Sequence, residues 1–515
     1  MLQIRNLTVF HKKDLRTILQ DFNFVLNDGD KTVIIGEEGN GKSTLLKLIY
    51  DPMLVEDYVE YSGDILTGRQ KLGYIAQEMP QEHLGKTVYE YFCEAPLFFD
   101  LTPGELNAIT GQIGLAIDIL YSDQMVGTLS GGEKVKLQFA RMLMEQPDVY
   151  LLDEPSNDID IATLEWLEQF IQKCDKPVLF VSHDETLIER TANSVINIEL
   201  VRKKTLPRYT VANVPYREYI SRRASALDRQ EQQANKEKDE FDKKMARYRQ
   251  IHDKVEHQQN TISRQDPHGG RLLKKKMHAV TSMGKRFEKE KENLTQLPDV
   301  EDAIFMAFPE EIAMPNGKTV LELQLDELKI GERLLARDVE LRVQGPQKVC
   351  IIGKNGAGKT TLIRRIAEEL LPRRDIQAAY MAQNYEERLD MAATPVDFLN
   401  RSGSKEEMTR IRNFLGSVRY TPDEMSHAIA ELSGGQKAKL LFIQMVLEGN
   451  NVLILDEPTR NFSPMSNPVI RDILKQYGGA IISVSHDRKY IDEVCDTVYE
   501  LTENGLVRKY TGRQN

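Results

Sequence analysis

A motif of eight residues with the pattern GxxxxGK[ST] occurs twice, at residues 36–43 and 353–360. Each motif follows an apolar run of strand length and precedes an amphipathic segment of helix length. A glycine loop in that setting points backbone N–H groups at phosphate oxygens, and the helix N-terminus adds partial positive charge. The loop lysine neutralises the β- and γ-phosphates, and the hydroxyl that follows it holds Mg²⁺. We therefore expect two sites for ATP and Mg²⁺. The residues expected to bind ATP there are Gly36, Gly39, Asn40, Gly41, Lys42, Ser43, Thr44, Gly353, Asn355, Gly356, Ala357, Gly358, Lys359, Thr360 and Thr361.

Two acidic pairs, Asp153-Glu154 and Asp456-Glu457, each end an apolar run that reads as a buried strand. The first acid of each pair suits the shell of Mg²⁺, and the second is placed to polarise the attacking water. Taken alone, such a pair is more often a helix N-cap. The phosphate loops upstream reverse that judgement. The expected metal ligands are Ser43, Asp153, Thr360 and Asp456, and the expected catalytic acids are Glu154 and Glu457.

A third motif, LSGGE at 129–133 and LSGGQ at 432–436, also occurs twice. Each opens a helix and presents a second N-terminus that can receive an anion. A single domain cannot aim this helix at its own phosphate loop. The two copies should therefore pack head to tail, with each ATP between the phosphate loop of one copy and the LSGG of the other. The residues expected to contact ATP from this motif are Ser130, Gly131, Gly132, Ser433, Gly434 and Gly435.

The motifs keep their spacing in the two halves of the chain. Leu129 to Asp153 and Leu432 to Asp456 both span 24 positions. Strand-like apolar runs alternate with helix-length amphipathic segments, which is typical of an α/β domain with a largely parallel sheet. We predict a first copy at residues 1–212, a linker at 213–299 and a second copy at 300–515.

The chain has 515 residues and a formal net charge of −11, and it is too long for a single core. No apolar run has the length of a membrane span, and the N-terminus lacks the layout of a signal peptide. The four cysteines are scattered without metal-ligand spacing, as expected of reduced thiols. These observations favour a cytoplasmic protein without a membrane partner.

The linker carries two ladders of apolar residues with a spacing of seven. The first contains Ile220, Leu227, Ala234, Phe241, Tyr248 and Val255, and the second contains Leu273, Val280, Phe287 and Leu294. Pro267, Gly269 and Gly270 lie between them and should set a turn. This pattern predicts an antiparallel helical hairpin with its tip at about 258–272. The first arm of about 45 residues would project about 65 Å.

Charge is unevenly distributed between the linker and the rest of the chain. Residues 216–298 hold 20 Lys or Arg against 13 Asp or Glu, and residues 258–286 hold seven basic residues and one acid. A solvated coiled coil explains a basic run equally well. The gathering of positive charge at the tip favours contact with a polyanion. The residues expected to contact RNA are Arg264, Arg271, Lys274, Lys275 and Lys276.

The combination of phosphate loop, LSGGQ, LLDEP and SHD resembles the ATP-binding-cassette ATPases over roughly residues 1–200 and 318–510. The resemblance implies that Gln77 and Gln383 sense Mg²⁺ and the attacking water, and so count among both the metal ligands and the catalytic residues. It also implies that His183 and His486 contact the γ-phosphate and that Phe10 stacks on adenine. The second copy offers no aromatic residue at the position of Phe10.

Tandem copies without membrane spans, joined by a long charged helical linker, resemble the ABC-F group of translation-acting ATPases. That resemblance implies a monomer, paired within the chain, whose linker enters the exit site of the 70S ribosome and meets 23S rRNA near the peptidyl-transferase centre and P-site tRNA. In the second copy Ser463 stands where Asp160 would align, and there is little room between Gln77 and Leu129 for an arm insertion. Both features resemble the antibiotic-resistance, or ribosome-protection, branch of the Vga/Lsa/Vml type. They imply protection against lincosamides, pleuromutilins and streptogramin A.

Three other functions remain open at this point. The first is a housekeeping ABC-F factor that regulates elongation, and the second is the ATPase subunit of a transporter. The third is a DNA-repair ATPase, although its coiled coil is normally longer and lies inside one cassette.

Overall fold

The computed structural model describes residues 1–201, 206–261, 267–295, 298, 312–418 and 420–509. It divides into two compact units. One unit contains Met1–Tyr216 with Glu301–Asn515, and the other contains Arg217–Val300.

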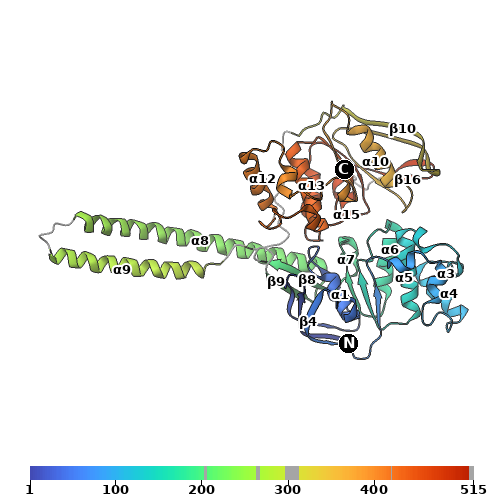
Figure 1. Cartoon of the computed structure of the whole chain (residues 1–515), viewed down its shortest axis with the longest axis horizontal. Helices are drawn as coiled ribbons and strands as arrows, with labels where there is room; N and C mark the ends of the chain where they lie inside the picture. The colour runs from blue at the N-terminus through green and yellow to red at the C-terminus, as the bar shows by residue number, and fades with distance from the viewer. Residues whose placement is uncertain (202–205, 262–266, 296–297, 299–311, 419, 510–515) are drawn as a thin grey trace. The chain divides into compact units, whose positions relative to one another are not determined.

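The first copy is built on a six-stranded sheet with the order β5-β6-β7-β3-β8-β9, in which only the β8–β9 pair is antiparallel (Figure 1). Its strands are β3 Lys31–Ile35, β5 Leu72–Ile75, β6 Val149–Asp153, β7 Val178–Val181, β8 Ser194–Val201 and β9 Leu206–Ala212. A second sheet, β2-β1-β4, is antiparallel and consists of β1 Leu2–His11, β2 Thr17–Leu26 and β4 Val59–Leu66. The helices are α1 Lys42–Tyr50, α2 Gln81–Leu84, α3 Val88–Cys93, α4 Pro103–Ile113, α5 Gly131–Met144, α6 Ile161–Lys173 and α7 Glu185–Thr191.

The second copy repeats this plan with the sheet order β13-β14-β15-β12-β16-β17 and an antiparallel pair β10–β11. Its strands are β10 Thr319–Ile330, β11 Arg333–Gln344, β12 Lys348–Ile352, β13 Ala378–Met381, β14 Val452–Asp456, β15 Ala480–Val484, β16 Thr497–Thr502 and β17 Gly505–Lys509. Its helices are α10 Lys359–Leu370, α11 Pro395–Leu399, α12 Lys405–Ser417, α13 Gly434–Glu448, α14 Asn467–Gln476 and α15 Arg488–Val494. The predicted pair of α/β domains is confirmed.

The central strands are buried along their whole length, which explains their unbroken apolar sequences. Every residue of β3, β6, β7, β14 and β15 is buried, as expected for parallel strands covered by helices on both faces. The two strands that end in acids, β6 and β14, therefore deliver Asp153 and Asp456 to the carboxyl edge of each sheet. This is the edge at which ligands bind in open α/β sheets.

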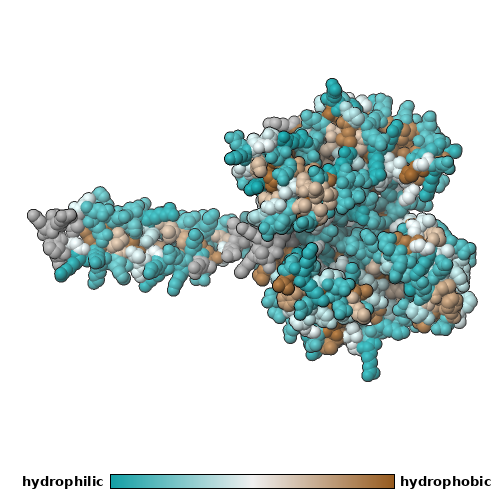
Figure 2. Space-filling view, in the orientation of Figure 1, coloured by the Kyte–Doolittle hydropathy of each residue, from teal (hydrophilic) through white to brown (hydrophobic). Residues whose placement is uncertain are grey.

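The second unit is built on two long helices, α8 Tyr216–Thr261, whose first residue belongs to the first unit, and α9 Pro267–Glu292. The two helices lie side by side and antiparallel in Figure 1. Phe241 packs against Phe287 with ring centroids 6.3 Å apart, and Tyr248 packs against the same ring at 5.7 Å. An ion pair joins Lys244 to Glu290. In Figure 2 hydrophilic residues cover the visible outer surface of this pair, and paler and brown residues follow the seam between the helices. The residues with a spacing of seven are thus the ones that hold the helices together.

The Pro-Gly-Gly sequence does not form the turn that we expected. Helix α9 begins at Pro267, so Gly269 and Gly270 lie in its first turn. Proline is favoured at the first helical position because its missing N–H would have no partner there. Residues 262–266, which include Arg264, lie outside the described residues. In the described part of the chain, no helix is both long enough and apolar enough to cross a membrane.

Candidate nucleotide sites

Site 1 is the expected nucleotide site at the phosphate loop of the first copy. The lysine of this loop makes hydrogen bonds to the loop's own backbone. Lys42 donates to the carbonyl oxygens of Gly36 and Glu37 at 2.9 and 3.0 Å. Gly41 has a φ of 85°, and a Cβ there would lie 2.1 Å from the side chain of Ile18. Only glycine fits this position, so strand β2 and the loop can approach each other closely.

The acids that follow β6 have distinct partners in site 1. The Ser43 hydroxyl donates to Asp153 at 2.7 Å. Glu154 accepts from Gln77 at 3.3 Å and lies 3.2 Å from Nε2 of His183. Burial alone would raise the pKa of Glu154, but the charge of His183 and its hydrogen bond outweigh burial and lower the pKa to about 2. Glu154 is therefore ionised at neutral pH.

The phosphate loop of the second copy, site 2, has the same backbone arrangement but different electrostatics. Lys359 donates to the carbonyl oxygen of Gly353 at 2.9 Å. Burial raises the pKa of Asp456 to about 6, and burial together with the charge of Asp456 raises the pKa of Glu457 to about 8. Both oxygens of Asp456 are buried, and neither makes a hydrogen bond of normal geometry among the described residues. Such a carboxylate, close to the Thr360 hydroxyl, fits a site for a cation.

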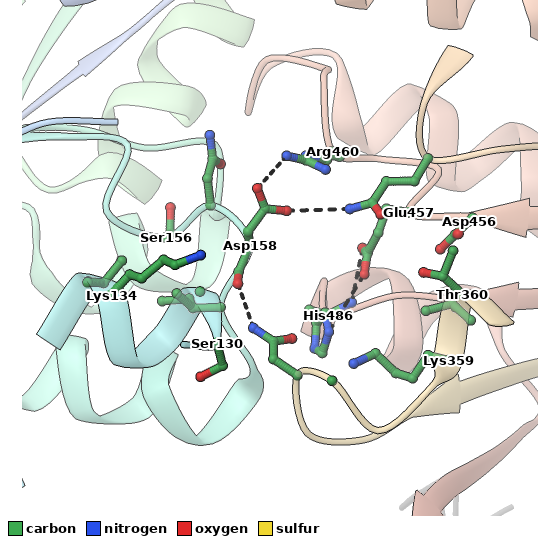
Figure 3. A pocket seen from close by; sticks show the side chains of 18 of the residues that line it. Ser130, Lys134, Ser156, Asp158, Lys359, Thr360, Asp456, Glu457, Arg460 and His486 are labelled. Atoms are coloured by element: carbon green, nitrogen blue, oxygen red, sulfur yellow. Dashed lines mark hydrogen bonds and ion pairs between the residues drawn. The ribbon is translucent and has the colours of Figure 1, made fainter. Parts of the chain in front are cut away.

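A cavity of about 730 Å³ in site 2 is lined by residues of both copies. Figure 3 shows Ser130 and Lys134 of the first copy facing Lys359, Glu457 and His486 of the second across this cavity. The size lies within the usual range for small-molecule sites. The predicted head-to-tail arrangement is therefore the one that the structure has for this site.

Asp158 of the first copy bridges the two copies beside this cavity. Its backbone carbonyl accepts from Asn355, and its carboxylate accepts from Arg460 at 2.7 Å and from Gln383 at 3.4 Å (Figure 3). The sequence-predicted Gln383 therefore contacts the opposite copy, whereas Gln77 contacts the Glu154 of its own copy.

The corresponding junction at site 1 is made by two acids of the phosphate loop. Glu38 accepts from the backbone N–H of Gly435 at 2.7 Å. Glu37 accepts from the hydroxyls of Ser463 and Ser466 at 2.9 and 2.6 Å. The LSGG of the second copy thus lies against the phosphate loop of the first, which completes the head-to-tail pairing.

The two signature helices begin as the sequence predicted. Ser130 caps α5 and Ser433 caps α13, each through a reciprocal capping box with the residue three positions later. The backbone N–H groups of Gly131, Gly132 and Gly435 belong to the first turn of these helices and lie at the positive end of each helix dipole.

The two sites differ where the adenine base of ATP is expected to bind. Phe10, the second-last residue of β1, is half-buried and pairs with Thr17, next to the Ile18 that contacts the phosphate loop. In the second copy, Ile330 and Arg333 line the cavity of site 2. The second copy thus has the aliphatic Ile330 and the guanidinium of Arg333 in the region where the first copy has Phe10.

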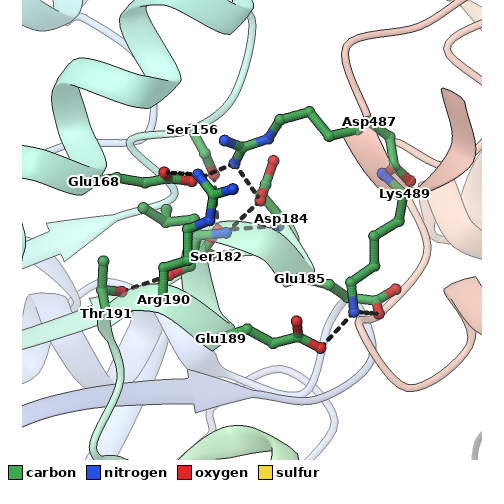
Figure 4. Close-up of polar contacts among 12 residues, drawn as sticks. Ser156, Glu168, Ser182, Asp184, Glu185, Glu189, Arg190, Thr191, Asp487 and Lys489 are labelled. Atoms are coloured by element: carbon green, nitrogen blue, oxygen red, sulfur yellow. Dashed lines mark hydrogen bonds and ion pairs between the residues drawn. The ribbon is translucent and has the colours of Figure 1, made fainter. Parts of the chain in front are cut away.

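A network of ion pairs also joins the two copies (Figure 4). Arg471 donates to both carboxylate oxygens of Glu185, and Lys489 binds the same acid at 3.0 Å. Arg488 reaches Glu168 and, at 3.2 Å, Asp184. At this junction α7 presents the acids Glu185 and Glu189, and the first turn of α15 presents the bases Arg488 and Lys489.

Sequence reasoning missed the contacts of Glu37, Glu38, Asp158 and Arg460 between the copies. A position-by-position comparison of the two copies would have drawn attention to three of them. Glu37-Glu38 corresponds to Lys354-Asn355, and Arg460 corresponds to Asn157. The partners themselves are several hundred positions apart and carry no local signal.

Four of the five basic residues expected to contact RNA lie on the surface of α9. Arg271, Lys274, Lys275 and Lys276 are all exposed. In the part of the chain that the structure describes, none of these four pairs with a carboxylate.

Comparisons with known proteins agree with this architecture. A family model described as "ABC transporter" matches residues 19–157 and 336–460. The chain is 28% identical to the ribosome protection protein VmlR of Bacillus subtilis (strain 168), over 96% of this chain and 86% of VmlR. It is 24% identical to ABC transporter F family member 5 of Arabidopsis thaliana, over 97% and 75%. Its fold is similar to that of archaeal ribosome recycling factor aABCE1 in a complex with stalk protein aP1, with a TM-score of 0.57, 17% identity and coverage of 96% and 87%. Because the family model covers just over half of the chain, this protein belongs to the ABC transporter family, and its two copies are nucleotide-binding ATPase domains.

Proposed function

We propose that this chain is an ATP-dependent ABC-F protein that binds the 70S ribosome and protects it from antibiotics of the peptidyl-transferase centre. The observation that carries the proposal is the pair α8 and α9, which joins two ATPase copies. It exposes a basic cluster of Arg271, Lys274, Lys275 and Lys276 that has no carboxylate partner among the described residues. An RNA backbone is the polyanion that such a cluster fits.

The names of similar proteins support this assignment. VmlR is named a ribosome protection protein, and aABCE1 is named a ribosome recycling factor. The proposed target is 23S rRNA near the peptidyl-transferase centre, together with P-site tRNA, reached through the exit site. The drugs are lincosamides, pleuromutilins and streptogramin A. The protein would act in the cytoplasm as a monomer.

Each ATP would lie between the phosphate loop of one copy and the LSGG of the other. Lys42 and Lys359 would neutralise phosphates once they release their own loop carbonyls. Mg²⁺ would be held by Ser43 with Asp153 and by Thr360 with Asp456, with Gln77 and Gln383 nearby, and it would offset the charge of the phosphates. Glu154 would orient and deprotonate water at site 1, and Glu457 would do so at site 2 once it has lost its own proton. His183 and His486 would contact the γ-phosphate.

The start of the linker is connected to the second copy. Tyr216, the first residue of α8, donates its hydroxyl hydrogen to the carbonyl oxygen of Pro464 at 3.2 Å. Pro464 follows Ser463, which binds Glu37 of site 1. Changes at site 1 therefore reach the base of α8 through two contacts. We infer that closure on ATP aims the helical pair.

The test is ribosome co-sedimentation together with growth in a lincosamide or pleuromutilin. A variant with Lys274, Lys275 and Lys276 changed to Glu should lose ribosome binding and protection but keep its ATPase activity. The control carries the same charge change at Lys236, Lys238 and Lys243, which are exposed on α8. If both variants bind ribosomes equally well, the proposed RNA contact is wrong.

Shortening 259–270 by a few residues separates protection from binding. We expect the shortened chain to sediment with ribosomes and hydrolyse ATP while the cells lose drug resistance. Unchanged drug susceptibility on removing the gene would instead favour a housekeeping role in elongation, for which the similarity to plant F-family members is the supporting observation.

A further inference from the structure

The two phosphate loops differ at the two positions after their first glycine. Site 1 has Glu37 and Glu38 where site 2 has Lys354 and Asn355. Two carboxylates in a phosphate-binding loop should weaken the binding of phosphate, because like charges repel. Their contacts in the structure explain why this chain can hold them.

Glu38 occupies the N-terminus of α13. Its Oε2 accepts from the N–H of Gly435 at 2.7 Å, where the helix presents its partial positive charge. A Cβ on Gly434 would lie 2.8 Å from the same oxygen, so the carboxylate is seated directly on the signature glycines. Glu38 is otherwise exposed, which leaves it free to be displaced.

Glu37 is buried and held by the second copy. Ser463 and Ser466, both fully buried, donate to its Oε1, and Lys439 lies 4.0 Å from its Oε2. Ser463 stands where the first copy has Asp160, and an aspartate there would place a second carboxylate against Glu37. The acidic phosphate loop and the missing aspartate are therefore matched substitutions at one contact.

Site 2 uses an amide at the same place. Asn355 donates to the backbone carbonyl of Asp158, and it brings no negative charge to the opposite signature helix. At the position that faces the signature helix, the two sites therefore differ in charge, Glu38 against Asn355, in addition to the neighbouring difference of Glu37 against Lys354.

We propose that Glu38 takes the place of a terminal phosphate at the signature helix and makes site 1 selective for a nucleoside diphosphate. This inference rests on the proposed placement of nucleotide between phosphate loop and LSGG. A triphosphate has to displace Glu38 from Gly435 or accept its charge beside the γ-phosphate. A diphosphate leaves the Glu38 contact in place, so site 1 stays closed around it while site 2 responds to the γ-phosphate.

The experiment measures the affinity of the full chain for fluorescent MANT-ADP and for the non-hydrolysable MANT-AMPPNP. Lys359→Ala silences site 2, so that the titration reports site 1. In that background Glu38→Asn should lower the ratio of the triphosphate Kd to the diphosphate Kd by about tenfold. An unchanged ratio overturns the proposal.

The reverse variant guards against a failure of Glu38→Asn to fold. In a Lys42→Ala background, Asn355→Glu should raise the same ratio at site 2, and no rise would count against the proposal. Correct folding is checked by circular dichroism and by the emission of the single tryptophan, Trp166. No ribosome is present, so a negative result leaves the ribosome assignment untouched, and a failed ribosome assay leaves this one standing.

Discussion

The buried ion pair between Arg471 and Glu185 offers a quantitative test of how the two copies are held together. Their side chains are 3% and 5% exposed. Removing one partner of such a pair leaves a buried charge and costs about 3–5 kcal/mol. In Arg471→Met, Glu185 would keep Lys489 at 3.0 Å, and Glu493, already 41% exposed, would turn to water. We therefore expect a loss at the lower end, about 3 kcal/mol.

The assay is urea unfolding followed by the fluorescence of Trp166, which lies in α6 with its ring centroid 5.2 Å from that of Phe139. Only the transition of the first copy is analysed, since two domains need not unfold in one step. The matched control is Lys176→Met, which breaks a pair with Asp148 in which the two side chains are 50% and 45% exposed. Because exposed pairs contribute little, the control should lose at most about 1 kcal/mol.

A double variant completes the cycle. Arg471→Met with Glu185→Leu removes both charges and should recover at least about 1 kcal/mol of the loss of the single variant. If Arg471→Met costs no more than the exposed control, the reasoning from burial is refuted.

Three further outcomes can be checked on the purified chain. Changing Glu154 and Glu457 to Gln should leave ATP binding intact and slow hydrolysis by about a factor of 10² or more, and steady-state phosphate release near the wild-type rate would contradict their assignment. Ser433→Arg should disable nucleotide binding at the Lys42 site and spare the other site, which separate titrations of each site would show. Burial alone would raise the pKa of Glu37, but its lysine and serine partners outweigh burial and hold the pKa below its ordinary value of 4.5. Its contribution to stability is therefore complete above about pH 4.5 and lost as the pH falls through the lower folded pKa, so Glu37→Gln should weaken the acid dependence of unfolding.

The parts of the sites that sequence could predict are those specified by local backbone. The acids after β6 and β14 follow runs of residues that only a buried strand accommodates, and Ser130 and Ser433 carry the spacing of a capping box. Repetition of each signal in the second half made an accidental match improbable.

The parts that sequence missed depend on contacts between distant residues. Glu37 and Ser463 are 426 positions apart, and each alone reads as a departure from a pattern. Only the structure shows that Glu37 and Ser463 are in contact. The error at Pro267 has a different origin, because proline and glycine are as compatible with the first turn of a helix as with a loop. A proline followed by glycines therefore does not distinguish the start of a helix from a loop.

The charges on α7 and α15 also restrict how chains can exchange partners. Glu185 and Glu189 on α7 meet Lys489 on α15, so each helix carries one sign at the junction. Two first copies brought together would oppose acid to acid, and two second copies would oppose base to base. Any swapped dimer must therefore pair unlike halves, and that exchange regenerates both nucleotide sites.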